Sequence, residues 1–144
     1  MGRTHYGLRD EIKDATDDFY KALSKRNLKL MEQVWTHVPY ASAAGRGGEL
    51  AQGWSNVRAY WEQRFMQYGD TEMKVRLTRM QCHAAGDIAW LSGVEVRTIT
   101  TGDSTHEEQL RVTCVLQRDT SGWQLVSYHA SLPTQPAGVA PPSS

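Results

Sequence analysis

The sequence predicts an α+β fold in which a cone-shaped, curled antiparallel sheet packs on three N-terminal helices. Before Gly69, apolar residues recur mostly every three to four positions, which is the period of helices. From Met73 onward they alternate with polar residues, which is the period of strands. The alternation changes phase near Thr78, and this predicts a β-bulge that helps the sheet to curl. With 144 residues, the chain has the length of one domain.

Three helices are predicted along the first half of the chain. The first covers about residues 5–25, where apolar side chains share one face and charged residues lie between them. Asn27 is a candidate N-cap for a short second helix that carries Leu28 to Trp35. Ser55 is a candidate N-cap for the third helix, and Gly69 fits its C-terminal end.

A short hairpin is predicted between the second and third helices. Pro39 prevents the second helix from continuing. Residues Tyr40–Ala44 and Glu49–Gln52 are candidate partner strands, and the glycine-rich segment Gly45–Gly48 is the turn between them.

Long strands are predicted in the second half of the chain. A turn at Ala85–Asp87 separates the first two, a polar connection at Thr101–Thr105 precedes the third, and a turn at Asp119–Gly122 precedes the last. The expected strands are Met73–Ala84, Ile88–Thr100, Leu110–Arg118 and Gly122–Leu132.

The last strand has no plainly polar face. Period-two alternation puts Trp123, Leu125, Ser127, His129 and Ser131 on one side and Val126, Tyr128, Ala130 and Leu132 on the other. We therefore expect this strand to lie inside the sheet with both faces partly covered. Because the chain after Pro133 is rich in Pro, Ala, Gly and Ser, we expect a single domain over residues 1–133 and a disordered tail over residues 134–144.

Composition argues against several classes of function. Sixteen Lys and Arg balance sixteen Asp and Glu and are dispersed among them, so no nucleic-acid surface is predicted. Cys82 and Cys114 form no CxxC pair, so neither a disulfide framework nor a structural zinc site is expected. No apolar run is long enough to span a bilayer, and the N-terminus lacks a signal-peptide core. We expect a cytoplasmic protein with no metal and no organic cofactor.

Three local patterns give the chain a resemblance to a known family. They are Val34-Trp35 with Pro39-Tyr40, Gly45–Leu50 and Gly53-Trp54; the segment Trp54–Trp61; and Arg111-Val112-Thr113 with Gly122–Val126 and His129-Ala130-Ser131. On these residues the chain resembles the SnoaL-like branch of the nuclear transport factor 2-like (cystatin-like) superfamily. The last block is also similar to the association domain of calcium/calmodulin-dependent protein kinase II, which shares the fold. The resemblance covers nearly the whole chain except the tail.

This resemblance implies a fold more specifically than a function. The superfamily contains isomerases, dehydratases, epoxide hydrolases, polyketide cyclases and non-catalytic oligomerisation domains. The chain has no match to the acid–arginine–acid set of the limonene epoxide hydrolases, nor to the tyrosine and two acids of ketosteroid isomerase. His129, Arg111 and Arg97 resemble polar positions in the pocket of the kinase association domain. The resemblance also implies a homodimer or a higher homo-oligomer that pairs through the sheet.

The candidate catalytic residues are His129, Tyr40 and Tyr128. An imidazole titrates near neutrality and can act as a general acid or base. A tyrosine hydroxyl can donate a hydrogen bond to a carbonyl or enolate oxygen. His129 equally fits a core histidine that is hydrogen-bonded to a neighbouring strand or to an interface partner.

The candidate substrate-binding residues are arginines and tryptophans. Arg97 and Arg111 lie within predicted strands, where an inward-pointing guanidinium binds a carboxylate or phosphate and an outward-pointing one keeps the sheet soluble. Glu95 shares a face with Arg97, so an internal salt bridge is a further alternative. Aromatic side chains would either line the pocket or belong to the core. The aromatic candidates for substrate binding are Trp54, Trp61 and Trp90.

Two functions follow from these features. The first is a small-molecule pocket protein, which as an enzyme would transfer protons without a cofactor on a small carbonyl or polyketide-like substrate, as isomerases, cyclases and dehydratases do. The second is a non-catalytic ligand-binding or oligomerisation domain, in which His129 and Arg111 are structural. Neither function implies nucleic acid or a membrane as a partner.

Overall fold

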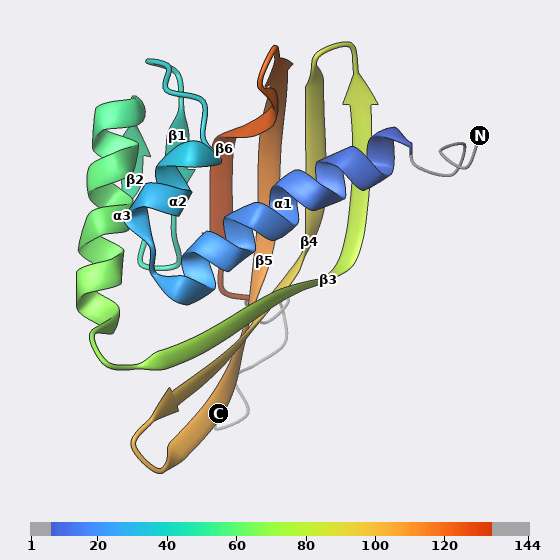
Figure 1. Cartoon of the computed structure of the whole chain (residues 1–144). Helices are drawn as coiled ribbons and strands as arrows, with labels where there is room; N and C mark the ends of the chain where they lie inside the picture. The colour runs from blue at the N-terminus through green and yellow to red at the C-terminus, as the bar shows by residue number, and fades with distance from the viewer. Residues whose placement is uncertain (1–6, 134–144) are drawn as a thin grey trace, which may run out of the picture.

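The computed structural model describes residues 7–133 and arranges them as helices on one side of a six-stranded sheet (Figure 1). The predicted fold class is confirmed. Residues 5 and 6 of the predicted first helix and the predicted tail 134–144 lie outside the described residues. The elements are α1 (Leu8–Lys25), α2 (Leu28–Gln33), β1 (Ser42–Ala44), β2 (Leu50–Gln52), α3 (Trp54–Tyr68), β3 (Glu72–Ala85), β4 (Ile88–Thr101), β5 (Ser104–Asp119) and β6 (Gly122–Ser131).

Helix α1 lies across the sheet in front of β3 to β6 (Figure 1). Its apolar stripe is buried, including Ile12 and Phe19, whereas Lys13 forms an exposed ion pair with Asp17 one turn later. The side chain of Asp10 accepts a hydrogen bond from the Gly7 backbone N–H at 3.0 Å, which satisfies a donor at the helix start. The amphipathic pattern of the sequence therefore places the helix on the sheet.

Three of the sequence predictions concern residues that cap α2 and α3. Asn27 is the N-cap of α2, because its Oδ1 accepts a hydrogen bond from the Leu30 N–H at 3.0 Å. Gly69, with φ 54°, ends α3 as predicted. The prediction of Ser55 as an N-cap is wrong: the N-cap is Gly53, whose φ of 86° favours glycine. Helix α2 also ends at Gln33, earlier than expected.

The strand order is β2-β1-β6-β5-β4-β3, and neighbouring strands are antiparallel except for β1 and β6. This parallel pair aligns Ala43 with Tyr128, so the short hairpin extends the sheet beside the last strand. Strand β5 begins at Ser104, six residues before the expected Leu110. Its first residues are polar and mostly exposed, so they lack the apolar alternation from which a strand is predicted.

Two irregularities decide which side chains face the helices. The predicted bulge near Thr78 is confirmed by a register shift between Thr78 and Gln81, and Arg79 has a φ of 56°. A second shift pairs Val115 with Ser127 but Leu116 with Leu125, which leaves Val126 as an extra residue.

The extra residue makes the predicted faces of β6 wrong. Trp123 and Leu125 belong to the same core as Tyr128 and Ala130, whereas His129 is exposed. We call the side toward the helices the inner face and the opposite side the outer face.

The core lies between the inner face and the helices. Phe19 of α1 contacts the rings of Trp61 in α3 and Tyr128 in β6, with ring centroids 5.5 and 5.1 Å away. Trp35, after α2, is also buried and its backbone bridges to Leu125 of β6. Aromatic packing therefore joins elements that are far apart in the sequence.

We predict that Gly93→Ala destabilises the protein. A Cβ at Gly93 would lie 2.9 Å from the Thr78 carbonyl oxygen and 3.0 Å from Leu77 Cδ1, so the bulge of β3 would have to move away from β4. The expected loss is about 1–3 kcal/mol of unfolding free energy, measured by urea denaturation. The neighbouring exposed Ser92→Ala is the control and should have little effect. Equal stabilities for the two variants would contradict this account of Gly93.

Candidate functional site

A cavity of about 240 Å³ lies between α3, the turn after β1 and the inner faces of β3, β4 and β5. Helix α3 contributes Tyr60, Trp61, Arg64 and Tyr68 at the spacing of one helix face. Strand β4 contributes Arg97 and Ile99, and β5 contributes His106 and Glu108, in each case two residues apart. The helix and strand periods therefore direct these side chains into one space.

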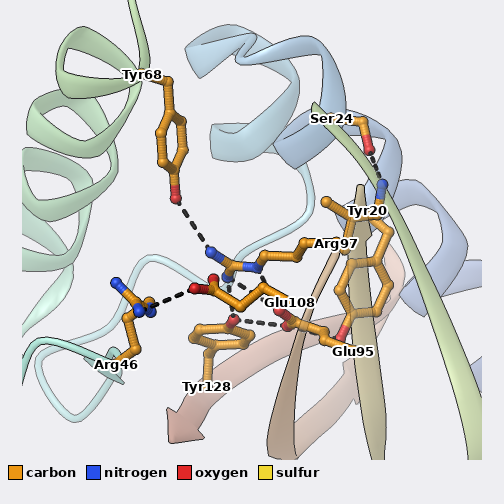
Figure 2. A network of polar contacts seen from close by, with 9 residues as sticks. Tyr20, Ser24, Arg46, Tyr68, Glu95, Arg97, Glu108 and Tyr128 are labelled. Atoms are coloured by element: carbon orange, nitrogen blue, oxygen red, sulfur yellow. Dashed lines mark hydrogen bonds and ion pairs between the residues drawn. The ribbon is translucent and has the colours of Figure 1, made fainter. Parts of the chain in front are cut away.

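A buried polar network supports the cavity (Figure 2). Glu95 is fully buried. Its Oε1 accepts a hydrogen bond from Arg97 Nε at 3.0 Å and forms an ion pair with Arg97 Nη2 at 2.9 Å. Its Oε2 accepts hydrogen bonds from the hydroxyls of Tyr128 at 2.6 Å and Tyr20 at 2.9 Å. Both carboxylate oxygens are thus satisfied by groups from α1, β4 and β6. The alternative of an internal salt bridge between Glu95 and Arg97 is confirmed.

Burial and the Glu95 carboxylate together set the protonation of the network. Burial raises the pKa of the Tyr20 and Tyr128 hydroxyls well above the ordinary value, and the nearby Glu95 charge raises them further. Burial is the largest single influence on the pKa of Arg97 and lowers it, but the charge and hydrogen bond of Glu95 together with Tyr128 and Tyr68 outweigh burial, so the net direction is upward. The two tyrosines therefore remain neutral donors and Arg97 remains a cation at physiological pH.

Arg97 carries the network into the cavity. Its Nη1 donates to the Tyr68 hydroxyl at 3.3 Å, and its Nη2 donates to the Tyr128 hydroxyl at 3.3 Å (Figure 2). A guanidinium has five N–H donors, so one N–H on Nη1 has no acceptor among residues 7–133. Tyr68 accepts from Arg97, and its own O–H likewise has no acceptor within that range.

A third donor is unmatched in the cavity wall. Trp61 is 1% exposed, and its indole Nε1–H has no acceptor among the described residues. Its Nε1 atom is inaccessible, so the unmatched donors that the cavity offers a ligand are those of Arg97 and Tyr68. This arrangement matches a ligand that carries an oxygen acceptor.

The charges around the cavity are nearly balanced. Arg46 pairs with Glu108 at 2.9 Å, Arg64 pairs with Glu49, and Arg97 pairs with Glu95. The cation of Arg64 also lies over the Tyr60 ring, 5.1 Å from its centroid. Burial raises the pKa of Tyr60, which the nearby Arg64 partly offsets. Each arginine in the wall is therefore already compensated by a carboxylate.

Gly45 leaves room for Tyr60 in the cavity wall. A Cβ on this residue would lie 1.9 Å from the Tyr60 hydroxyl oxygen, so a larger residue would displace that tyrosine. The glycine-rich turn that the sequence shows between β1 and β2 thus lets Tyr60 and Arg64 of α3 pack closely against Gly45.

The structure brings together only part of the predicted site. Arg97 and Trp61 line the cavity, and Tyr128 lies beneath it, bonded to Arg97 and Glu95. Tyr128 has both hydroxyl functions occupied within the network, so it supports the site and does not reach a ligand.

His129 and Arg111 lie on the outer face, away from this cavity. They line a separate groove with Ser131, to which Arg111 donates a hydrogen bond at 3.3 Å. The prediction that His129 and Arg111 join Arg97 in one pocket is wrong, because alternation sends residues 129 and 128 to opposite faces of β6.

The other predicted residues also lie outside the cavity. Tyr40 is 62% exposed and donates a hydrogen bond to Gln117. Trp54 stacks on His37 with ring centroids 4.1 Å apart. Trp90 is exposed on the outer face and contacts His83. The prediction that these three residues form part of the pocket is therefore wrong.

Sequence reasoning missed Tyr68, His106 and Glu108 as site residues. Tyr68 belongs to the apolar stripe of α3, where a hydroxyl gives no signal of its own. His106 and Glu108 alternate with polar neighbours before the apolar part of β5, and they share the phase of buried Leu110. Extending that phase backward is the signal that would have identified them.

Two features are absent from the described part of the chain. Within residues 7–133, no group of three or more His, Cys, Asp and Glu side chains is placed to hold a metal ion. No helix in the same range has the length and hydropathy needed to cross a membrane.

Comparisons with known proteins agree with the architecture. The family model described as a SnoaL-like domain matches residues 12–135. No curated protein matches the chain. Among solved structures, a protein from Thiobacillus denitrificans assigned as a calcium/calmodulin-dependent protein kinase type II association domain superposes with a TM-score of 0.72. It is 25% identical, and the match covers 85% of this chain and 94% of that one.

Two further solved structures resemble the chain in fold. One, from Streptomyces avermitilis, is assigned as a dehydratase of the nuclear transport factor 2-like family; it has a TM-score of 0.80 and 18% identity, with 88% and 97% of the two chains covered. The other, a nuclear transport factor 2-like superfamily protein from Salmonella enterica, has a TM-score of 0.77 and 21% identity, with 92% and 96% covered.

We predict that Glu95→Gln strongly destabilises the fold. The amide keeps the volume but leaves the buried Arg97 cation without its counter-charge. Removing one partner of a buried pair costs about 3–5 kcal/mol, which urea denaturation would detect. The control is Glu62→Gln, whose carboxylate is half-exposed and 3.8 Å from Arg58, and which should change stability little. Similar losses for both variants would show that the network does not stabilise the fold.

Proposed function

The chain belongs to the SnoaL-like family, and from that premise together with the donors in the cavity we propose that it binds a small organic molecule through a carbonyl oxygen. The observation that carries the proposal is the pairing of Arg97 with Tyr68. Each has a donor directed at no acceptor among residues 7–133, and both line the same space. A carbonyl oxygen with two lone pairs accepts from both.

The charge balance of the site favours a neutral carbonyl compound over an organic anion. Arg46, Arg64 and Arg97 each have a carboxylate partner, so an added anion would also meet the charges of Glu108, Glu49 and Glu95. A neutral carbonyl oxygen uses the unmatched N–H and O–H donors without adding net charge.

The size and walls of the cavity narrow the ligand further. A volume of about 240 Å³ lies below the range of about 300–1,000 Å³ that is usual for drug-sized ligands. Tyr60, Trp61 and Ile99 supply apolar surface. A single ring that carries a carbonyl group fits these properties better than a polycyclic molecule does.

We predict that acetophenone binds in this cavity more tightly than benzoate or ethylbenzene. The three probes share a ring, but benzoate adds a charge and ethylbenzene lacks an acceptor. Two-dimensional NMR titration would measure the affinities and locate the shifted amides. Tyr68→Phe should weaken acetophenone about three- to tenfold through the lost hydrogen bond and leave ethylbenzene unchanged. Tyr40→Phe is the matched control, because Tyr40 lies outside the cavity.

Two results would contradict this proposal. One is equal affinity for the three probes, which would show that the donors of Arg97 and Tyr68 do not select a carbonyl oxygen. The other is a set of amide shifts that excludes α3 and the inner face of β4.

Proton transfer next to the carbonyl is the second candidate function, and the position of Glu108 favours it. The Glu108 carboxylate lines the cavity and lies between Arg46 and the Arg97 network (Figure 2). Its side chain is 19% exposed, so a carboxylate faces the ligand space near the donors. As a general base it would remove a proton from the carbon beside the carbonyl, while Arg97 and Tyr68 stabilise the enolate oxygen.

We predict that the protein accelerates exchange of the acetophenone methyl protons in D₂O, which NMR follows directly. Glu108→Gln should lower the catalysed rate about 100-fold or more, as expected for loss of a general base. Glu107→Gln is the matched control: it removes the adjacent carboxylate, which alternation directs to the other face of β5, and should keep the rate. Acetophenone binding with no accelerated exchange would leave ligand binding alone as the function.

A further inference from the structure

A carbonyl oxygen bound by Arg97 and Tyr68 leaves one acceptor of the inner cavity without a partner. Glu108 uses its Oε2 in the ion pair with Arg46, at 2.9 Å. Its Oε1 has no hydrogen-bond donor among residues 7–133, although the side chain is partly buried and lines the cavity. A ligand that fills the cavity displaces water from this oxygen. A carboxylate oxygen that is removed from water and given no donor costs free energy.

Strand register places this acceptor beside the unmatched donor of Arg97. Arg97 and Glu108 are directly paired across β4 and β5, and both side chains line the cavity. Directly paired side chains on one face have Cβ atoms about 4.5–5.5 Å apart. No ion pair joins these two side chains, because Arg97 is paired with Glu95 instead. The carboxylate of Glu108 is turned toward Arg46 (Figure 2). The cavity wall therefore presents an N–H donor next to a carboxylate oxygen.

A ligand that carries an acceptor and a donor on adjacent groups matches this wall. A primary amide or a lactam has a carbonyl oxygen and an N–H on the same side of one plane. Conjugation keeps the amide planar, so both groups are oriented before binding. A ketone has only carbon-bound hydrogens where the amide has its N–H, and it leaves the Glu108 oxygen without a donor. A carboxylic acid ionises at about pH 4 and then has no donor either.

We propose that the cavity is selective for a neutral primary amide or lactam. This selectivity rests on the carbonyl binding proposed above and adds a second contact to it. The carbonyl oxygen accepts from Arg97 Nη1 and Tyr68, and the N–H beside it donates to Glu108 Oε1. Arg46 holds the other carboxylate oxygen and so orients Oε1. The contact gives the Glu108 oxygen a donor without adding net charge to a site whose charges are already balanced.

Benzamide and acetophenone test the added contact, because they have the same shape and differ only in an NH₂ group in place of a CH₃ group. NMR titration of the full chain measures both affinities for the wild-type protein and for Glu108→Leu, which removes the acceptor. We expect the ratio of benzamide affinity to acetophenone affinity to fall about tenfold or more in the variant, as loss of a hydrogen bond to a charged group predicts. The ratio cancels differences between the two probes in water.

N-methylbenzamide tests the geometry of the contact. Its trans amide places the methyl group beside the carbonyl oxygen and directs the N–H to the opposite side. The wild-type protein should therefore bind it about tenfold or more weakly than benzamide, and Glu108→Leu should reduce this difference. Circular dichroism establishes whether Glu108→Leu is folded. The wild-type comparison needs no variant, so equal wild-type affinities for the two amides would by themselves overturn the proposed contact.

Glu107→Leu is the matched control. It removes the neighbouring carboxylate of β5, which alternation directs to the other face of the sheet, and it changes the net charge equally. The ratio of benzamide affinity to acetophenone affinity should stay at its wild-type value. An equal fall of this ratio in Glu107→Leu and Glu108→Leu would overturn the assignment of the acceptor to Glu108.

The remaining outcomes distinguish the amide selectivity from the carbonyl binding on which it rests. Acetophenone binding with the same affinity ratio in the wild-type protein and Glu108→Leu would overturn the selectivity and leave carbonyl binding intact. Failure of both probes to bind would overturn carbonyl binding and the selectivity together. Binding of benzamide alone, lost in Glu108→Leu, would support the amide contact and contradict the proposal that a carbonyl oxygen suffices.

Discussion

The fully buried carboxylate of Glu95 is the constraint on which the rest of this structure depends. An ionised carboxylate removed from water must be matched by a cation and by hydrogen-bond donors, or the folded state loses several kcal/mol. Here Arg97 supplies the cation, and Tyr20 and Tyr128 supply the neutral donors. Hydrogen bonds are directional, so this requirement specifies where α1 and β6 lie relative to β4, which apolar contact alone would specify less sharply.

Arg97 links the buried Glu95 carboxylate to the ligand cavity. Its Nε and Nη2 are held by Glu95 and Tyr128, so the guanidinium has a defined orientation and only Nη1 is directed toward Tyr68. Donors that are oriented before a ligand arrives need no reorganisation when charge develops on an oxygen. The same buried pair therefore stabilises the fold and places the donors on which the proposed function depends.

The two faces of the sheet differ in chemistry although they come from the same strands. On the inner face, arginines are paired with carboxylates, and the cavity is small and walled by aromatic rings. On the outer face, Arg79 and Arg111 have no acidic partner among residues 7–133 and line a wide groove with His129. Alternation along each strand produces this separation, and the two bulges determine where the alternation changes phase.

The sequence by itself determined the features that depend on neighbouring residues: the helical and strand periods, the caps at Asn27 and Gly69, and the bulge near Thr78. It also indicated that Glu95 and Arg97 share a face. Only the tertiary structure decided that Val126 is an extra residue in β6, because a bulge there is defined by the register with β5. It likewise decided that Tyr68 meets Arg97. Contacts between residues so distant in the chain depend on how helices pack on a curled sheet, and local periodicity does not specify that packing.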